Sequence, residues 1–214
     1  MANTFFSSDY HFFHENVIKY DNRPFKDVYH MNDEIIRKHN ERVKPEDVVY
    51  FLGDFGFRAS IQKAHRGEGQ PYNPKEILKK MNGTDWQFVG GNHDKASNKF
   101  NPKTESMVLN QNGLKIKLVH DPKYAEIDYP LNICGHVHCS WKVKEITYCN
   151  RTSLIINVGC CVWDYYPVKL DELLSIYHKW VNERKQLHFW QPASIIKKLN
   201  KGTLCQNREE RLLN

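Results

Sequence analysis

Side chains that can bind metal ions recur along the chain in short clusters. Asp9 and His11 are separated by one residue, so both side chains point to the same side of an extended segment. His136 and His138 have the same spacing. Each cluster alone is common in proteins and is more often explained without a bound metal, for example by a turn. Metal binding is therefore a hypothesis that depends on the remaining members of the set.

The complete set of such side chains is much more specific than its parts. It offers imidazole, carboxylate and amide donors without a thiolate, from Asp9, His11, Asp54, Asn92, His120, His136 and His138. These donors suit hard or borderline divalent ions; they are too many for one ion but fit two that share a bridging carboxylate. Two such ions would activate a water and neutralise the oxygens of a phosphate ester. The predicted chemistry is phosphate-ester hydrolysis.

The clusters follow segments that the sequence predicts to be buried strands. Runs of β-branched, aliphatic or aromatic residues end shortly before them, at 4–6, 48–52, 86–89, 114–119 and 131–134. In open α/β sheets, ligand groups gather at the carboxyl ends of the strands. We therefore expect these side chains to meet at that edge of a mixed α/β domain.

Helical patterns lie between and after the strands. The spacing predicts a helix over 31–43 with Asn32 as its N-cap, and another over 74–81 with Asn73 as its N-cap. A third helix is predicted over 171–184, where apolar side chains recur at helical spacing. Together with the strands, these helices indicate an α/β protein.

Composition excludes several classes of protein. The chain has 214 residues, of which 40% are hydrophobic, which is enough for a globular domain with a core. Its mean hydropathy is −0.68, and no apolar run approaches the roughly 20 residues that cross a bilayer, so no membrane association is expected. The N-terminus lacks a secretory leader pattern, and the six cysteines include no Cys-x-x-Cys pair. We expect a cytoplasmic protein with reduced thiols.

The positive charge is concentrated at the C-terminus. Of the net charge of +6, residues 185–214 contribute +4, from six Lys/Arg against two Glu. We therefore divide the chain into a domain over 1–184 and a basic extension over 185–214. The extension interleaves apolar and basic residues, which suits nucleic-acid binding or docking on the domain or on a second subunit. The helical spacing of its apolar residues favours docking.

The order of the clusters resembles the calcineurin-like metallophosphoesterases, in particular their small bacterial and bacteriophage members. The five motif blocks of that family are D-x-H, G-D, G-N-H-D/E, H and G-H-x-H. All five are present here, as Asp9-Tyr10-His11, Gly53-Asp54, Gly91-Asn92-His93-Asp94, His120 and Gly135-His136-Val137-His138. The resemblance covers about residues 1–170, and Gly-Asn-His-Asp is its most specific block.

The resemblance implies a fold and a set of ligand roles. The fold would be a four-layer α-β-β-α sandwich, with two mixed sheets flanked by helices, followed here by a C-terminal helical extension. One ion would be bound by Asp9, His11 and His138, the other by Asn92, His120 and His136, with Asp54 bridging them. Mn²⁺ is the first expectation, and Fe, Zn or Ni are alternatives.

Three further residues take roles in the implied reaction. A metal-bridging hydroxide would attack the phosphorus, and His93 would act as general acid, with Asp94 orienting its imidazole. Histidine suits this role because its pKa lies near neutrality and a nearby carboxylate can raise it. His14 would either line the substrate pocket or have a structural role.

The substrate class is the least determined part of the prediction. The expected substrates are phosphodiesters or phosphomonoesters of nucleotides, cyclic nucleotides or short nucleic acids. A phosphoprotein phosphatase is an alternative, which the small size of the chain disfavours. A non-catalytic binding or scaffold protein on the same fold is another, which the intact ligand set disfavours. Basic groups in loops could bind phosphate, but each is expected to be solvated: Arg23, Arg58, His65 and Arg66.

Overall fold

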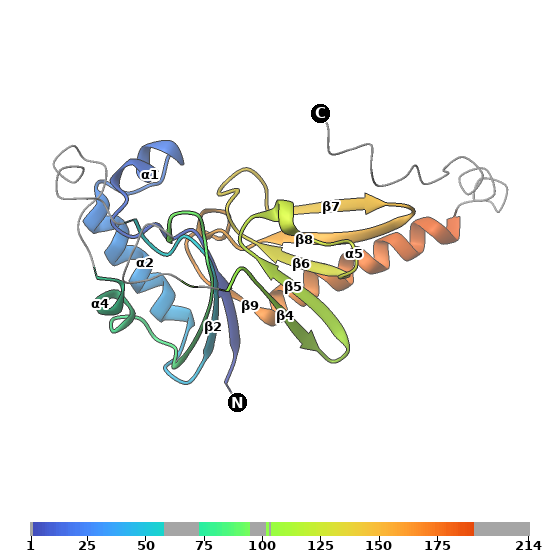
Figure 1. The fold of residues 1–214 in the computed structure, drawn as a ribbon, viewed down its shortest axis with the longest axis horizontal. Coiled ribbons are helices and arrows are strands. Elements are labelled where there is room, and N and C mark those ends of the chain that lie inside the picture. The colour runs from blue at the N-terminus through green and yellow to red at the C-terminus, as the bar shows by residue number, and fades with distance from the viewer. Residues whose placement is uncertain (1, 58–72, 95–101, 103, 191–214) are drawn as a thin grey trace.

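The computed structural model describes residues 2–57, 73–94, 102 and 104–190, with side chains up to residue 184. Within these residues the chain forms two mixed β-sheets with helices packed against them (Figure 1). The expected α/β architecture, with two mixed sheets, flanking helices and a C-terminal helix, is confirmed. Arg58, His65 and Arg66, and the part of the basic extension after residue 190, lie outside the described residues.

The first sheet has four strands in the order β3-β2-β1-β9. Its strands are β1 (Thr4–Ser7), β2 (Val48–Leu52), β3 (Asp85–Val89) and β9 (Val168–Lys169). β1, β2 and β3 are parallel, while β9 is antiparallel to β1. The three parallel strands agree with the predicted ones to within one residue at each end.

The second sheet has five strands in the order β4-β5-β6-β8-β7. Its strands are β4 (Ser106–Gln111), β5 (Leu114–Val119), β6 (Leu131–Cys134), β7 (Val143–Tyr148) and β8 (Arg151–Asn157). β5, β6 and β8 are parallel, and the two edge strands pair with them antiparallel. β5 and β6 have the predicted bounds.

Three helices cover the first sheet on its far side from the second (Figure 1). They are α1 (Glu15–Tyr20), α2 (Val28–Arg42) and α4 (Pro74–Leu78). Their buried side chains pack with aromatic residues that follow β1 and line β2, including Tyr10, Phe12, Phe51 and Phe55. Short 3₁₀ turns lie at Pro122–Tyr124 and Cys160–Trp163.

Of the two N-caps predicted from the sequence, the structure has one at the predicted residue and the other at a different residue. Asn73 caps α4 as predicted, because its side chain accepts a hydrogen bond from the backbone N–H of Lys75. α2 begins earlier than predicted, since Asp27 rather than Asn32 is its N-cap. Asn32 is instead buried inside the helix and accepts a hydrogen bond from the backbone N–H of Phe13.

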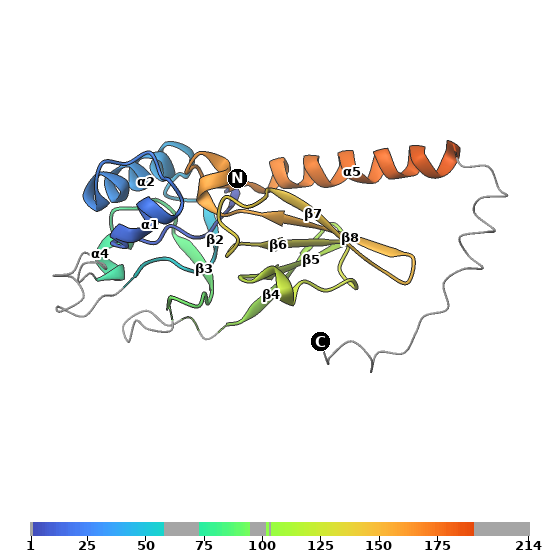
Figure 2. The same cartoon turned by 90° about the horizontal axis from the view of Figure 1, so that it is seen from above.

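The main core lies between the two sheets and continues under the last helix. Phe6, Leu52 and Val89 of the first sheet pack with aliphatic side chains of β5, β6 and β8. α5 (Leu170–Trp190) joins the same core through Leu170 and Leu173 and runs along the five-stranded sheet (Figure 2). The two sheets are thus held in a fixed relation, which matters because the ligand clusters come from both.

Two sequence expectations about the chain as a whole can be compared with the structure. Cys134, Cys139, Cys160 and Cys161 carry free thiols, but Cys149 is disulfide-bonded, so the expectation that every cysteine is reduced is wrong. Among the described residues, no helix has the length and apolarity that crossing a membrane requires.

Candidate metal centre

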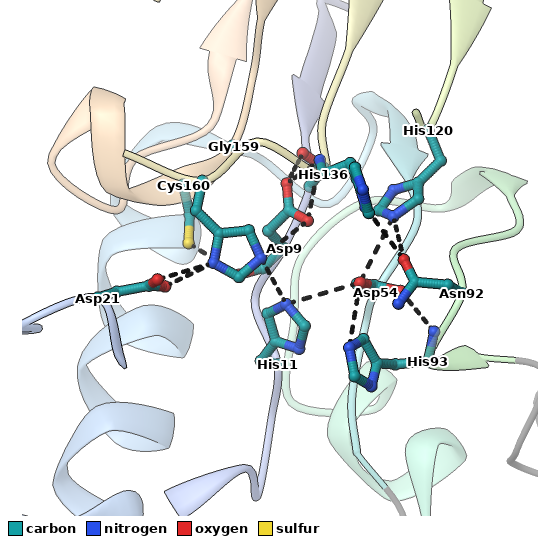
Figure 3. Close-up of polar contacts among 12 residues, drawn as sticks. Asp9, His11, Asp21, Asp54, Asn92, His93, His120, His136, Gly159 and Cys160 are labelled. Carbon is teal, nitrogen blue, oxygen red and sulfur yellow. Dashed lines mark hydrogen bonds and ion pairs between the residues drawn. The ribbon is translucent and has the colours of Figure 1, made fainter. Parts of the chain in front are cut away.

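The side chains predicted to bind metal lie together where the parallel strands of both sheets end (Figure 3). Three strands of the first sheet lead to Asp9 and His11, to Asp54, and to Asn92. Two strands of the second sheet lead to His120 and to the pair His136 and His138. A β-bridge between Ser8 and Gly159 joins the ends of β1 and β8, so the two strand edges face each other.

Hydrogen bonds to Asp9 connect the end of β1 in the first sheet to the loop after β6 in the second sheet. Its carboxylate accepts hydrogen bonds from the backbone N–H of His136, at 2.9 Å and 3.1 Å to its two oxygens. The Ser8 hydroxyl donates to the same carboxylate at 2.6 Å. Asp9 is fully buried, so its orientation is fixed by these contacts.

One group of ligand atoms forms around Asp9, His11 and His138. Nε2 of His11 lies 3.1 Å from Nε2 of His138, which in turn lies 3.8 Å from Oδ1 of Asp9. One ligand atom from each residue lies within 4.8 Å of those of the other two. This spacing suits a shared cation.

A second group forms around Asn92, His120 and His136. Oδ1 of Asn92 lies 3.1 Å from Nε2 of His120 and 3.1 Å from Nδ1 of His136. Asp54 lies between the two groups, because its Oδ2 is 3.4 Å from Nε2 of His120 and 3.6 Å from Nε2 of His11. All seven side chains thus come together in one cluster, in which Asp54 contacts His11 and His120.

The backbone adopts an uncommon conformation at most of these residues. Positive φ angles occur at five of the seven: Asp9 (58°), His11 (52°), Asp54 (57°), His136 (71°) and His138 (45°). Non-glycine residues rarely adopt this left-handed conformation, which costs free energy and clusters at functional sites. Packing around the cluster therefore holds these side chains in place against a local backbone penalty.

Two glycines of the motif blocks allow the loops to approach one another. A Cβ at Gly91 would overlap the carboxylate and the backbone nitrogen of Asp54. A Cβ at Gly135 would meet the Ser8 hydroxyl and lie 2.7 Å from Oδ2 of Asp9. Only glycine leaves room for the ligand carboxylates at these two positions.

The buried carboxylates of this cluster require positive charge nearby. Asp9 and Asp54 are 0% and 1% exposed, and in the described part of the chain their ion-pair partners are histidines alone. Burial raises the pKa of Asp9. Burial alone would lower the pKa of His120, but its hydrogen bond to Asp54 and the nearby carboxylates raise it to about 9. A proton on His120 thus supplies charge that a bound cation would supply instead.

The chemistry of these donors fits divalent cations. The donors are nitrogen and oxygen atoms, which Mn²⁺, Fe²⁺ and Zn²⁺ accept. Burial lowers the pKa of His11 well below its ordinary value, which keeps its ring neutral as ligation requires. Two ring nitrogens at the site, Nδ1 of His11 and of His14, are buried without a hydrogen-bond partner among the described residues.

His93 and Asp94 occupy different positions relative to the cluster. The backbone N–H of His93 donates to Oδ1 of Asp54 at 2.9 Å, and its side chain is about one third exposed. Nε2 of His93 lies 4.0 Å from Oδ2 of Asp54. The carboxylate of Asp94 accepts from the backbone N–H groups of Asp54, Phe55 and Gly91, at 2.8 Å, 3.0 Å and 2.9 Å. The expectation that Asp94 orients His93 does not match these contacts. The Asp94 carboxylate instead connects the loop after β3 to the loop after β2 through hydrogen bonds.

His14 lies at the edge of the cluster. Its ring stacks on Phe57 with centroids 4.4 Å apart, and its centroid is 5.8 Å from that of His93. Burial lowers its pKa to about 4, so the ring is neutral at physiological pH. A neutral imidazole can donate one hydrogen bond and accept another.

Three further residues support the site, and sequence reasoning assigns none of them to it. The expectation that Arg23 is solvated is wrong, because its guanidinium is buried and donates to the carbonyls of Asp9 and Tyr10. Asp21 contacts His138, and Asn157 donates to the carbonyl of His138 and accepts from the N–H of Gly159. The sequence signal is only a group of polar residues in turns, which is equally typical of solvated loops.

An open cleft lies beside the second group of ligands. Its volume is about 870 Å³, and its lining includes Asn92, His120 and His136. Lys123 and Tyr124 also line it. Ligand pockets of roughly 300–1,000 Å³ bind small organic molecules, so a ligand larger than a phosphate ion could lie next to the metal ligands.

No family model matches the chain. Among solved structures, a protein of unknown function from Aquifex aeolicus, AQ665, is similar with a TM-score of 0.59 and 24% identity, over 82% of this chain and 100% of that one. This likeness shows a shared fold. Vps29 from Chaetomium thermophilum has a TM-score of 0.39 with 12% identity, over 73% of this chain and 70% of that one. A novel archaeal phosphodiesterase has a TM-score of 0.37 with 19% identity, over 75% of this chain and 86% of that one.

A sequence relative establishes a family for the chain. The uncharacterized protein MJ1445 of Methanocaldococcus jannaschii is 36% identical over 184 residues. The match includes 84% of this chain and 93% of the relative. The chain therefore belongs to the same protein family as MJ1445.

Proposed function

We propose that this protein is a metal-dependent phosphoesterase with two divalent ions at the described cluster. The observation that carries the proposal is the place of Asp54, whose Oδ2 is within 3.6 Å of a ligand nitrogen from each of the two groups. A carboxylate between two sets of imidazoles is the arrangement that a pair of cations requires. Asp9, His11 and His138 would hold one ion, and Asn92, His120 and His136 the other.

The bound ions would supply a nucleophile from water at neutral pH and neutralise the charge of the phosphate oxygens. Mn²⁺ is the proposed native ion, with Fe, Zn or Ni as alternatives, because the donors are imidazole, carboxylate and amide. The chain itself contributes the fixed positions of these donors. The left-handed backbone at Asp9 and Asp54 and the glycine at 135 keep the carboxylates directed into the cluster.

His93 is proposed to donate the proton to the leaving oxygen. Its imidazole is more exposed than those of His11 and His120, and its Nε2 lies 4.0 Å from Oδ2 of Asp54, at the solvent side of the cluster. A substrate bound over the two groups would therefore present its leaving oxygen on the side of His93. His14, neutral and next to His93, is proposed to hydrogen-bond the substrate.

The substrate is proposed to be a phosphate ester with an organic group of nucleotide size. The cleft beside Asn92, His120 and His136 adjoins the proposed second ion and could accept that group. Exposed Tyr124 on the cleft wall could stack on a base. Nucleotides, cyclic nucleotides and short nucleic acids share these features.

The proposal is tested by an activity panel on chelator-stripped protein with and without added Mn²⁺. The panel contains one phosphomonoester, one linear phosphodiester and one cyclic phosphodiester, each with the wild type and with Asp54→Asn. We expect turnover of at least one class that requires Mn²⁺ and is lost in Asp54→Asn. Turnover that survives metal removal, or bound metal without turnover of any class, would contradict a metal-dependent esterase.

A further inference from the structure

We infer that Asp21 and Arg23 act together as a clamp that positions the ligands of one metal ion, that of Asp9, His11 and His138. Neither belongs to the motif blocks, and both lie in the segment that joins α1 to α2. The inference rests on the proposed function, because it concerns the affinity of the same cluster for an ion.

Asp21 holds His138 from the side opposite to the cluster. The Nδ1 of His138 lies 2.7 Å and 2.9 Å from the two carboxylate oxygens of Asp21, while its Nε2 faces His11. A hydrogen bond from Nδ1–H to the carboxylate leaves Nε2 with its lone pair directed at the ion position. Carboxylates in this relation fix the tautomer and the ring orientation of a ligating histidine and raise its basicity.

Arg23 connects the Asp21–His138 contact to the segment that carries the other two ligands of this ion, Asp9 and His11. Its Nη2 donates to the backbone carbonyl of Asp9 at 3.0 Å and to Oδ2 of Asp21 at 3.0 Å. Its Nη1 donates to the carbonyl of Tyr10 at 3.0 Å, and its Nε donates to Asp21 at 3.1 Å. One buried guanidinium therefore fixes both the backbone that carries Asp9 and His11 and the carboxylate that orients His138.

In the described part of the chain, the two histidines of the second group have no carboxylate within hydrogen-bond distance behind their rings. The Nδ1 of His120 lies 2.7 Å from the backbone carbonyl of Leu52, which carries no charge. The Nε2 of His136 is 3.8 Å from Asp121, and that carboxylate also pairs with Lys123 at 2.8 Å. The close, charged contact behind His138 thus distinguishes the two ion positions, and removal of Asp21 should affect one ion only.

The test titrates chelator-stripped full-length protein with Mn²⁺ by calorimetry. The wild type is compared with Asp21→Ala and Asp21→Asn, and Asp33→Asn is the control because Asp33 is an exposed carboxylate on α2. We expect Asp21→Ala to lower the affinity for one of the two bound Mn²⁺ ions by about 10–100-fold. The affinity for the other Mn²⁺ ion should change by no more than about twofold. Asp21→Asn should lower the first affinity less, since its amide oxygen can still accept from Nδ1–H. Arg23→Lys, which loses the planar fork, should weaken the same equivalent.

Two measurements separate positioning from simple charge loss or misfolding. In a His138→Ala background, Asp21→Ala should have no further effect on Mn²⁺ affinity, whereas a general charge effect would persist. In the metal-free protein at alkaline pH, ¹⁵N spectra should show Nδ1–H on His138 in the wild type and a shift toward Nε2–H in Asp21→Ala. The spectral comparison requires no bound ion and reports only on folded protein.

The outcomes distinguish this inference from the proposed function. Two Mn²⁺ equivalents in the wild type, both unchanged in Asp21→Ala, would overturn the clamp and leave the phosphoesterase intact. An equal loss of both equivalents would also overturn it, because the clamp contacts the ligands of one ion. A wild type that binds no Mn²⁺ would overturn the proposed function and the clamp together.

Discussion

The carboxylate of Asp9 is held by the backbone N–H of His136, at 2.9 Å to one oxygen and 3.1 Å to the other. Asp9 follows a strand of the four-stranded sheet, whereas His136 follows a strand of the five-stranded sheet. Their contact means that the ligand cluster forms only when the two sheets are docked. Changes that disturb this seam should therefore affect metal binding before they affect either sheet alone.

The first prediction concerns Gly135, which lies at this seam. Gly135→Ala places a Cβ against Ser8 and 2.7 Å from Oδ2 of Asp9, so it should displace the Asp9 carboxylate and weaken Mn²⁺ binding at least tenfold. Calorimetry on the stripped protein measures this. Gly113→Ala is the control, because a Cβ there meets nothing within 4 Å and costs only the strain of its φ of +88°, about 1–2 kcal/mol. Equal Mn²⁺ affinities in the two variants would contradict the prediction.

The second prediction concerns the carboxylate between the two ligand groups. Asp54→Asn should lower the amount of bound metal and abolish turnover, because a neutral amide cannot offset the repulsion of two cations. Elemental analysis of purified protein measures the metal, with Asp33→Asn as the matched carboxylate-to-amide control. A full metal complement in Asp54→Asn would show that this carboxylate does not bridge.

The third prediction concerns His93, whose imidazole lies near His11 and Asp54 and is proposed to donate a proton rather than to bind an ion. His93→Ala should keep its metal while turnover falls by about 10²–10⁴-fold, the range of general acid catalysis. The loss should be smaller for an ester with a nitrophenolate leaving group, which needs no proton. His178→Ala, an exposed histidine on α5, serves as the control. Loss of metal in His93→Ala would exclude the role of a proton donor.

The fourth prediction concerns His39, a buried histidine away from the metal ligands. Its Nδ1 accepts from the Tyr10 hydroxyl at 3.2 Å, and its Nε2–H donates to the carbonyl of Asn82 at 2.9 Å, so the neutral ring is fully bonded. Burial lowers its pKa from 6.5 to about 4. Between these pH values the unfolded ring binds a proton that the folded ring does not, so stability falls as pH falls.

Urea unfolding at several pH values, with chelator present, measures this effect. His39 should contribute a loss of up to about 1.4 kcal/mol for each pH unit below 6.5, until the pH reaches about 4. His39→Gln should be less stable at neutral pH but should have a shallower slope in this window. Parallel slopes for the two proteins would show that His39 remains protonatable in the folded state.

The ligand cluster could be predicted from the sequence because its signal is local. Each ligand follows an apolar run that ends in a turn, and parallel strands necessarily bring their carboxyl ends together. The contacts of Arg23 and Asp94 could not be predicted in this way. Burial of the Arg23 guanidinium and the three amide contacts of Asp94 depend on loops that approach one another only in the folded chain.

The same distinction holds for the elements of the fold. β2 and β6 are largely apolar and buried, and β5 alternates lysines with buried apolar residues, so the sequence indicates the bounds of all three strands. β4 and β7 are edge strands with alternating or largely exposed residues, and such patterns are weak signals. The cap of α2 shows the same limit, because Asp27 and Asn32 are both suitable N-caps and tertiary packing buries Asn32.

The most direct test of the two-metal site is a crystal structure of the protein soaked in Mn²⁺, with anomalous data collected at the manganese edge. We expect two anomalous peaks, one on each side of the Asp54 carboxylate. One should lie among Asp9, His11 and His138, and the other among Asn92, His120 and His136. Fully occupied crystals with no peak at Asp54, or with a single peak that all these residues share, would contradict a dinuclear site.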